Sequence, residues 1–129
     1  MRILSLNTGL LSFLFGEVSW HSEMGDLKVR AQRIASKLLA MPHPPDVICL
    51  QELFDGRSRR TIIKTLKPIY PYYFADENVG AFLVGANSGL AIFSKYPIKN
   101  KILKAYEFAS GDSFLSRKSI MGVRLELNN

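Results

Sequence analysis

The run Val47–Leu50 is entirely apolar and is followed at once by two polar residues, Gln51 and Glu52. A short apolar run preceded by prolines is typical of a buried strand. In the alternation of such a strand, Glu52 shares a face with Ile48 and Leu50 and is expected to point toward the core. An isolated carboxylate is costly to bury, so it must be paired, protonated or bound to a metal. This stretch therefore predicts a strand whose end carries either an ion pair or a cation site.

A second polar residue is expected close to this carboxylate. Residues 2–7 form another apolar strand that ends at Asn7, and Asp26 is expected to cap a helix that runs to about Met41. A helical crossover makes the two strands parallel neighbours, with their C-terminal ends at one edge of the sheet, where ligand sites lie. Asn7 and Glu52 are therefore expected to lie together. The apolar face of the helix consists of Leu27, Ala31, Ile34 and Leu38.

The remaining elements predict the fold class. A second helix is expected over residues 57–66, and strand-like segments separated by Gly, Asn, Pro and Asp follow it. We predict an α/β fold: a layered mixed β-sheet with helices on one face, in a single domain. The strand-like segments are residues 72–77, 81–86, 89–97, 101–108 and 119–127.

Charge and cysteine content limit the partners and the chemistry. The 129-residue chain has a formal net charge of +6, which favours nucleic acid, anionic lipid headgroups or phosphoesters. Its basic residues are scattered apart from Arg57, Arg59 and Arg60, so a solvated surface is an equal alternative. A single cysteine, Cys49, excludes an intramolecular disulfide and a zinc site of several thiolates. No segment reaches the roughly 18 apolar residues of a membrane span and no clear signal peptide is present, so a cytoplasmic or peripheral membrane location is expected.

A divalent cation is one way to satisfy Glu52. Mg²⁺ binds carboxylate oxygen and keeps several waters that a substrate phosphate can replace, and Asn7 would help to orient the carboxylate or the phosphate. The alternative is that Glu52 pairs with an arginine and Asn7 only makes a turn. Residues 109–119 form a polar loop that contains Asp112 and Lys118. A lysine at such an edge can neutralise a phosphate oxygen, although lysines in loops are more often solvated.

These features together resemble a known superfamily. They are the strand ending in Asn7, the segment Asp46–Glu52, the segment Ser88–Pro97, and the loop with Asp112 and Lys118 before a strand. In this order and spacing they are similar to the endonuclease/exonuclease/phosphatase superfamily of metal-dependent phosphodiesterases. The resemblance covers essentially the whole chain and implies the N-terminal half of that superfamily's sandwich.

Within the superfamily the motifs most resemble the neutral sphingomyelinase branch. The resemblance implies that Glu52 binds Mg²⁺, with Mn²⁺ as an alternative, and that Asn7 lies beside the metal and the phosphate. It also implies an activating role for Asp112 and Lys118, although Ser119 stands where the branch usually has glycine. The implied substrate is a phosphodiester, with a lipid headgroup favoured over nucleic acid. The segments that carry this resemblance are residues 52–55, 70–71, 88–102 and 111–119.

The same resemblance implies that part of the site is missing from this sequence. The superfamily's second half supplies a Thr-His segment, a Gly-Asp-x-Asn segment and a final Asp-His pair. None of these occurs here, and the only histidines are His21 and His43. Hydrolysis of a phosphodiester needs an activated water and charge neutralisation. We therefore expect this chain alone to have little or no catalytic activity.

Several alternatives remain open from the sequence. The apolar connection Leu10–Trp20 could contact a membrane interface, or it could pack on its own sheet, which we favour. The chain could belong to an enzyme that acts on DNA or RNA, or it could be a non-catalytic module that binds a partner or a phosphate surface. A half-fold also leaves a sheet edge and an apolar face uncovered, which predicts self-association.

Overall fold

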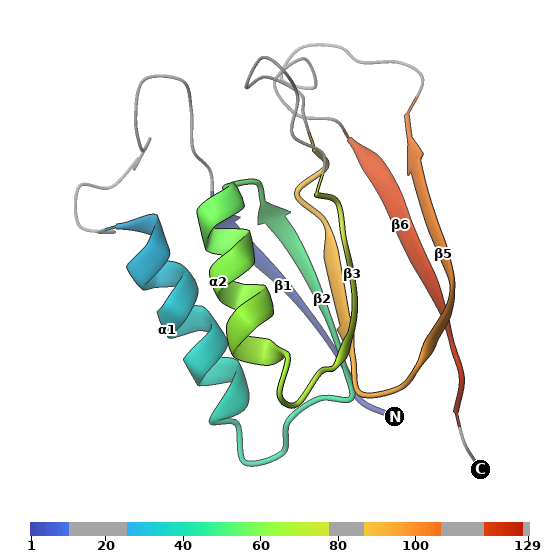
Figure 1. Cartoon of the computed structure of the whole chain (residues 1–129), viewed down its shortest axis with the longest axis horizontal. Helices are drawn as coiled ribbons and strands as arrows, with labels where there is room; N and C mark the ends of the chain where they lie inside the picture. The colour runs from blue at the N-terminus through green and yellow to red at the C-terminus, as the bar shows by residue number, and fades with distance from the viewer. Residues whose placement is uncertain (11–25, 78–86, 107–117, 128–129) are drawn as a thin grey trace.

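The computed structural model describes residues 1–10, 26–77, 87–106 and 118–127 (Figure 1). Two helices and six strands are found in these residues, in the predicted order strand, helix, strand, helix and then strands. Their bounds are β1 Ile3–Leu10, α1 Leu27–Leu39, β2 Val47–Leu53, α2 Gly56–Leu66, β3 Tyr72–Ala75, β4 Ala91–Ser94, β5 Ile98–Ala105 and β6 Ser119–Leu125.

The main sheet is mixed, as the sequence predicted. Its strand order is β1-β2-β4-β3, in which β1 and β2 are parallel while β4 runs antiparallel to both of its neighbours. The parallel pair is in the register Ile3 opposite Val47 through Asn7 opposite Gln51. The predicted crossover is thereby confirmed, and it brings the C-terminal ends of β1 and β2 to the same edge of the sheet.

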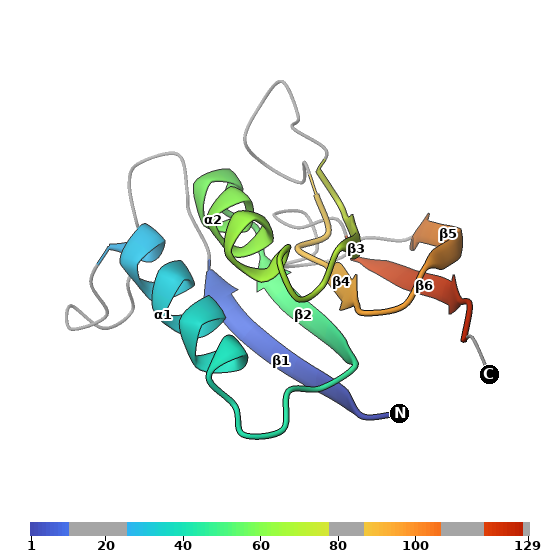
Figure 2. The same cartoon turned by 60° about the horizontal axis from the view of Figure 1, so that its bottom comes forward.

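Both helices cover one face of this sheet, where they enclose the core (Figure 2). Each helix begins at an aspartate whose carboxylate accepts a backbone N–H: Asp26 from Lys28 at 2.8 Å, and Asp55 from Ser58 at 2.6 Å. The helices pack through apolar side chains at helical spacing, and the strands contribute alternate side chains to the same core. The buried members are Leu10, Leu27, Ala31, Ala35, Leu38, Ile48, Leu50, Leu53, Ile62, Leu66, Tyr70, Ala91 and Phe93.

Several strands depart from the predicted bounds, and β1 and β5 each extend beyond them at one end. The first strand continues to Leu10 rather than ending at Asn7, because an irregularity in its register lets it pair again with Leu53. The strand predicted over 101–108 begins earlier, at Ile98, where it pairs with Leu125. The strand predicted over 81–86 lies outside the described residues.

A cluster at the N-terminal end of β2 joins two of the sequence motifs. The Asp46 carboxylate accepts the backbone N–H of Arg2 at 2.7 Å and faces the Lys95 ammonium at 3.4 Å. That ammonium also donates to the Pro44 carbonyl and lies 5.8 Å from the centre of the Tyr70 ring. The Arg2 N–H, together with Lys95, holds the pKa of Asp46 below its ordinary value of 3.8. Asp46, which begins the segment Asp46–Glu52, and Lys95, in the segment Ser88–Pro97, are therefore structural partners.

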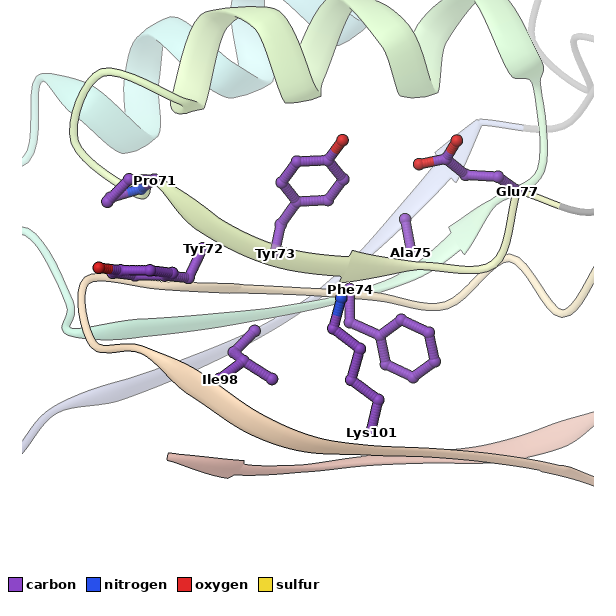
Figure 3. A pocket seen from close by; sticks show the side chains of 8 residues that line it. All are labelled: Pro71, Tyr72, Tyr73, Phe74, Ala75, Glu77, Ile98 and Lys101. Atoms are coloured by element: carbon purple, nitrogen blue, oxygen red, sulfur yellow. The ribbon is translucent and has the colours of Figure 1, made fainter. Parts of the chain in front are cut away.

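The strands β5 and β6 form a separate two-stranded antiparallel sheet. This hairpin lies on the other side of β3 and β4 from the helices (Figure 3). The predicted α/β layering is confirmed, with the order helices, mixed sheet, hairpin. Neither α1 nor α2 is long and apolar enough to cross a bilayer, and the described residues contain no other helix.

Candidate active site edge

The C-terminal ends of β1 and β2 meet at a β-bulge. Asn7 is opposite Gln51 and Leu10 is opposite Leu53, so two residues of β1, Thr8 and Gly9, correspond to the single residue Glu52 of β2. Bulges of this kind occur at sheet ends and beside active sites, where they change the direction of a side chain. The register therefore brings the strand carrying Asn7 against the segment carrying Glu52.

The backbone of Glu52 is in the left-handed region, with φ of 55°, which is uncommon for a residue other than glycine. This conformation interrupts the alternation of β2. Leu53 takes the next buried position after Leu50, while Glu52 is half-buried. The carboxylate thus does not follow the core face that the simple alternation predicted. Such strained residues persist only where their surroundings hold them, and they cluster at functional sites.

Three hydrogen bonds hold the bulge. The Arg30 guanidinium of α1 donates to the carbonyl oxygens of Thr8 and Gly9, each at 3.2 Å. The Thr8 hydroxyl donates to the Gln51 carbonyl across the strand pair at 2.9 Å. Gly9 has φ of 57°, which a glycine adopts at no steric cost. Hydrogen bonds thus join α1 to the bulge of β1, and the bulge to the end of β2.

The amide side chains of Asn7 and Gln51 at this edge both form hydrogen bonds. The Asn7 Oδ1 accepts the Gly9 backbone N–H at 3.0 Å, so Asn7 does make the local turn that was one of its two predicted roles. Asn7 is exposed, and its Nδ2 donates no hydrogen bond to another residue in the described part of the chain. The Gln51 Nε2 donates to the Ser5 hydroxyl at 3.0 Å on the face of the sheet away from the helices.

Glu52 is not in an ion pair with any described residue. The ion pairs among residues 1–10, 26–77, 87–106 and 118–127 are Lys95 with Asp46 and Lys99 with Glu126. The same residues contain no group of three or more His, Cys, Asp or Glu side chains that could enclose a metal. A single half-buried carboxylate beside the exposed Asn7 amide nevertheless suits Mg²⁺, which is often held by one or two carboxylates together with waters and substrate phosphate.

Two other predicted residues are not brought to this edge by any described contact. Asp112 lies outside the described residues, as does nearly all of the connection Leu10–Trp20. Lys118 is exposed and directly precedes β6, and its carbonyl accepts the Tyr106 N–H at 3.0 Å. In Figure 1 the arrows of β1, β2 and β5 point the same way, so the end of β5 and the start of β6 lie at the end of the molecule that carries Glu52.

Sequence reasoning missed the bulge and the arginine that holds it. No local pattern marks Arg30, because its partners are backbone carbonyls 21 and 22 residues away. The sequence signal that could have found the bulge is Thr8-Gly9 directly after a polar strand end, since glycine inside a strand often marks a bulge.

A pocket of about 410 Å³ lies elsewhere, along the edge strand β3. Figure 3 shows Tyr73 and Glu77 on the helix side of β3, and Tyr72 and Phe74 on the side of the hairpin. The Lys101 ammonium lies 5.3 Å from the centre of the Phe74 ring. In the sheet order β3 is at the opposite edge from β1, so this pocket is distinct from the bulge.

Comparison with known proteins identifies relatives of this chain. The model of the Endonuclease/Exonuclease/phosphatase family matches residues 6–119. Sphingomyelinase C of Leptospira interrogans is 32% identical over 111 residues, which cover 77% of this chain and 20% of that protein. Sphingomyelin phosphodiesterase 5 of Danio rerio is 29% identical over 94 residues, which cover 67% of this chain and 17% of that protein.

A solved relative has the same arrangement of elements. A mutant of beta toxin from Staphylococcus aureus, with bound magnesium ions, superposes with a TM-score of 0.76 and 25% identity. The match covers 98% of this chain and 45% of that one. The chain therefore spans less than half of this solved relative, and a fifth or less of the two curated relatives above.

Proposed function

The chain belongs to the endonuclease/exonuclease/phosphatase family, and on that premise we propose that it forms the metal-binding half of a Mg²⁺-dependent phosphodiesterase of sphingomyelinase type. Residues 1–129 constitute one partial domain in this proposal. The substrate is the phosphodiester of a lipid headgroup, since relatives named Sphingomyelinase C and Sphingomyelin phosphodiesterase 5 match over two thirds or more of the chain.

One structural observation carries the proposal. The bulge of β1 lies opposite Glu52, whose left-handed backbone takes it out of the alternation of the buried face. A carboxylate in a strained conformation, without an ion-pair partner in the described part of the chain, is costly unless it serves a ligand. Asn7 stands one register position away, with its Nδ2 as an available donor.

The residues have separate roles in this proposal. Bound Mg²⁺ would supply charge neutralisation at the phosphate. Glu52 holds the cation, and the Asn7 Nδ2 donates to a phosphate oxygen. Lys118 and Asp112 are proposed to act from the loop before β6, where Lys118 is exposed at the same end of the molecule.

Manganese binding tests the metal site without any need for activity. Mn²⁺ added well below equimolar amounts broadens the NMR signals of amides near its site. We expect selective broadening at Gln51–Leu53 and at Thr8–Gly9, and its loss in Glu52→Gln. Glu77→Gln, which changes an exposed carboxylate at the end of β3, serves as the matched control and should keep the broadening. Broadening that persists in Glu52→Gln would refute the assignment.

Hydrolysis assays test the reaction class. The 129-residue chain with Mg²⁺ should release little or no phosphocholine from sphingomyelin, because the Asp-His pair that the resemblance implies as general base does not occur in its sequence. A longer protein that contains this chain and a matching second half should hydrolyse sphingomyelin but should not nick plasmid DNA. Plasmid nicking without sphingomyelin hydrolysis would instead assign the protein to the nucleases of the family.

A further inference from the structure

The free edge of β3 carries backbone groups that no described residue uses. In an antiparallel pair such as β3 and β4, hydrogen-bonded and non-hydrogen-bonded residues alternate. The Asp76 N–H donates to the Leu90 carbonyl at 3.1 Å, so Asp76 and Phe74 direct their backbone groups toward β4. Tyr73 and Ala75 therefore direct their N–H and C=O groups away from the sheet. In the described part of the chain these four groups have no hydrogen-bond partner.

The pocket of about 410 Å³ follows this edge. Its walls are side chains from both faces of β3, together with Ile98 and Lys101 of β5 on the side of the hairpin (Figure 3). The pocket thus surrounds the edge itself rather than one face of the sheet. Its volume is within the range of ligand-binding clefts. A groove that follows free backbone donors and acceptors fits an extended polypeptide chain.

Two charged side chains of the pocket determine which peptide it favours. Lys101 is exposed, is in neither ion pair of the described residues, and lies with its ammonium 5.3 Å from the centre of the Phe74 ring. Glu77 is exposed on the helix side of β3. In an added strand, the residue opposite Phe74 lies on the hairpin side and its two neighbours lie on the helix side. Lys101 therefore favours a carboxylate opposite Phe74, whereas Glu77 disfavours one at the neighbouring positions.

We propose that β3 binds an extended peptide as an additional antiparallel strand, with an acidic residue opposite Phe74 and an apolar residue on each side of it. The peptide backbone hydrogen-bonds to Tyr73 and Ala75 and supplies the affinity, while Lys101 supplies the selectivity. A second copy paired through the same edge would bring its own hairpin to the same face of the joined sheet, so a single strand fits the groove better. The site lies at the opposite edge from β1 and does not depend on the metal proposed at Glu52.

The blocked peptide acetyl-Thr-Val-Glu-Val-Thr-amide tests the site. Its binding should shift the amide signals of Tyr73 and Ala75 and slow their hydrogen exchange. N-methylation of both valines removes the two N–H groups that face β3, and it should weaken binding about tenfold. N-methylation of the glutamate and the second threonine, whose N–H groups point away from β3, is the matched control. It should change the affinity by less than about twofold.

Variants of the chain test the same contacts from the other side. Ala75→Pro removes an N–H that points away from β4, which an edge strand tolerates, and it should weaken binding at least about fivefold. Lys101→Gln does not depend on that tolerance. It should weaken binding about threefold, but it should not affect a peptide with glutamine in place of glutamate. Lys104→Gln is the matched control, since Lys104 is exposed on the other face of β5 and should not change the affinity.

Four results would overturn the proposal. The first is a peptide that leaves the amide signals of Tyr73 and Ala75 unchanged. The second is an equal loss of affinity for the two N-methylated peptides, and the third is an equal loss for Lys101→Gln and Lys104→Gln. The fourth is a shift of the same two amide signals when the chain is concentrated without peptide, because a second copy would then occupy the edge.

Discussion

At the scale of single residues, the dipeptide Ser88-Gly89 shows why one position tolerates only glycine. Gly89 has φ of 67°, and a Cβ there would lie 2.8 Å from the ring of Phe54. The Gly89 N–H is held by the Asn87 side chain at 2.9 Å, and its carbonyl accepts the Leu53 N–H at 2.9 Å. The backbone of the segment that follows Glu52 is thereby fixed against the start of β4.

We predict that Gly89→Ala destabilises the chain by about 2–4 kcal/mol. The left-handed backbone penalises a Cβ by about 1–2 kcal/mol, and displacement of the Phe54 ring adds a similar amount. Urea denaturation measures the free energy of unfolding. Gly122→Ala is the matched control, because a Cβ at that position of β6 meets no described atom within 4 Å. A change at Gly89 as small as that at Gly122 would contradict this account.

The pH dependence of stability should report on Asp46. The Arg2 N–H and the Lys95 ammonium hold its pKa below the ordinary value, so the ionised form stabilises the folded chain. This contribution is present above the unfolded pKa of about 3.9 and is lost as the pH falls through the lower folded pKa. Unfolding free energies of the parent and Asp46→Asn should therefore differ at pH 7 and converge as the acid limit is approached. A difference that stays constant between pH 7 and pH 2 would be inconsistent with the ion pair.

At the scale of secondary structure, regular periodicity predicted the elements but long-range contacts set their ends. Of the face predicted from spacing alone, Leu27, Ala31 and Leu38 are buried and Ile34 is half-buried. The hydrogen bonds that hold the bulge in β1 were not predictable, because their donor, Arg30, is 21 residues away from Gly9. The left-handed φ of Glu52 was not predictable from the local sequence either.

We predict that Arg30→Met destabilises the chain by about 1–2 kcal/mol, since two backbone carbonyls lose charged donors while the apolar stem and helix propensity are kept. The amide signals of Thr8, Gly9 and Glu52 should shift together, because the bulge is no longer held. Arg33→Met is the control, as Arg33 is exposed on the same helix and is in none of the described side-chain hydrogen bonds. If the two variants unfold at the same urea concentration, the hydrogen bonds from Arg30 to the bulge do not contribute to the free energy of unfolding.

At the scale of the whole molecule, connection rules predicted the layers but not the position of the hairpin. A strand–helix–strand unit must place β1 and β2 in parallel, so the edge with Asn7 and Glu52 followed from the order of elements. The separation of β5 and β6 into their own sheet depends on tertiary packing that local patterns do not encode. The edge that carries Asn7 and Glu52 was predictable as a location, whereas the left-handed backbone of Glu52 needed coordinates.

The hairpin also carries the last prediction, that this chain self-associates. Ile102 and Ile120 are 63% and 55% exposed, and they lie on one face since their cross-strand partners are Gly122 and Lys104. Adjacent exposed apolar side chains on a two-stranded sheet favour burial against another surface.

Light scattering should therefore show a mass that rises with concentration. The double variant Ile102→Thr/Ile120→Thr should lower the association, since it keeps the β-branched shape and removes apolar area. Val29→Thr on α1, where the side chain is 45% exposed but lies on the far layer, should not change the association. A parent chain that stays monomeric at high concentration would contradict the prediction, because the face with Ile102 and Ile120 would then remain exposed to water without causing association. Association that persists in the double variant would instead place the contact on another surface, such as the edge strand β3, whose backbone donors and acceptors on one side have no strand partner among the described residues.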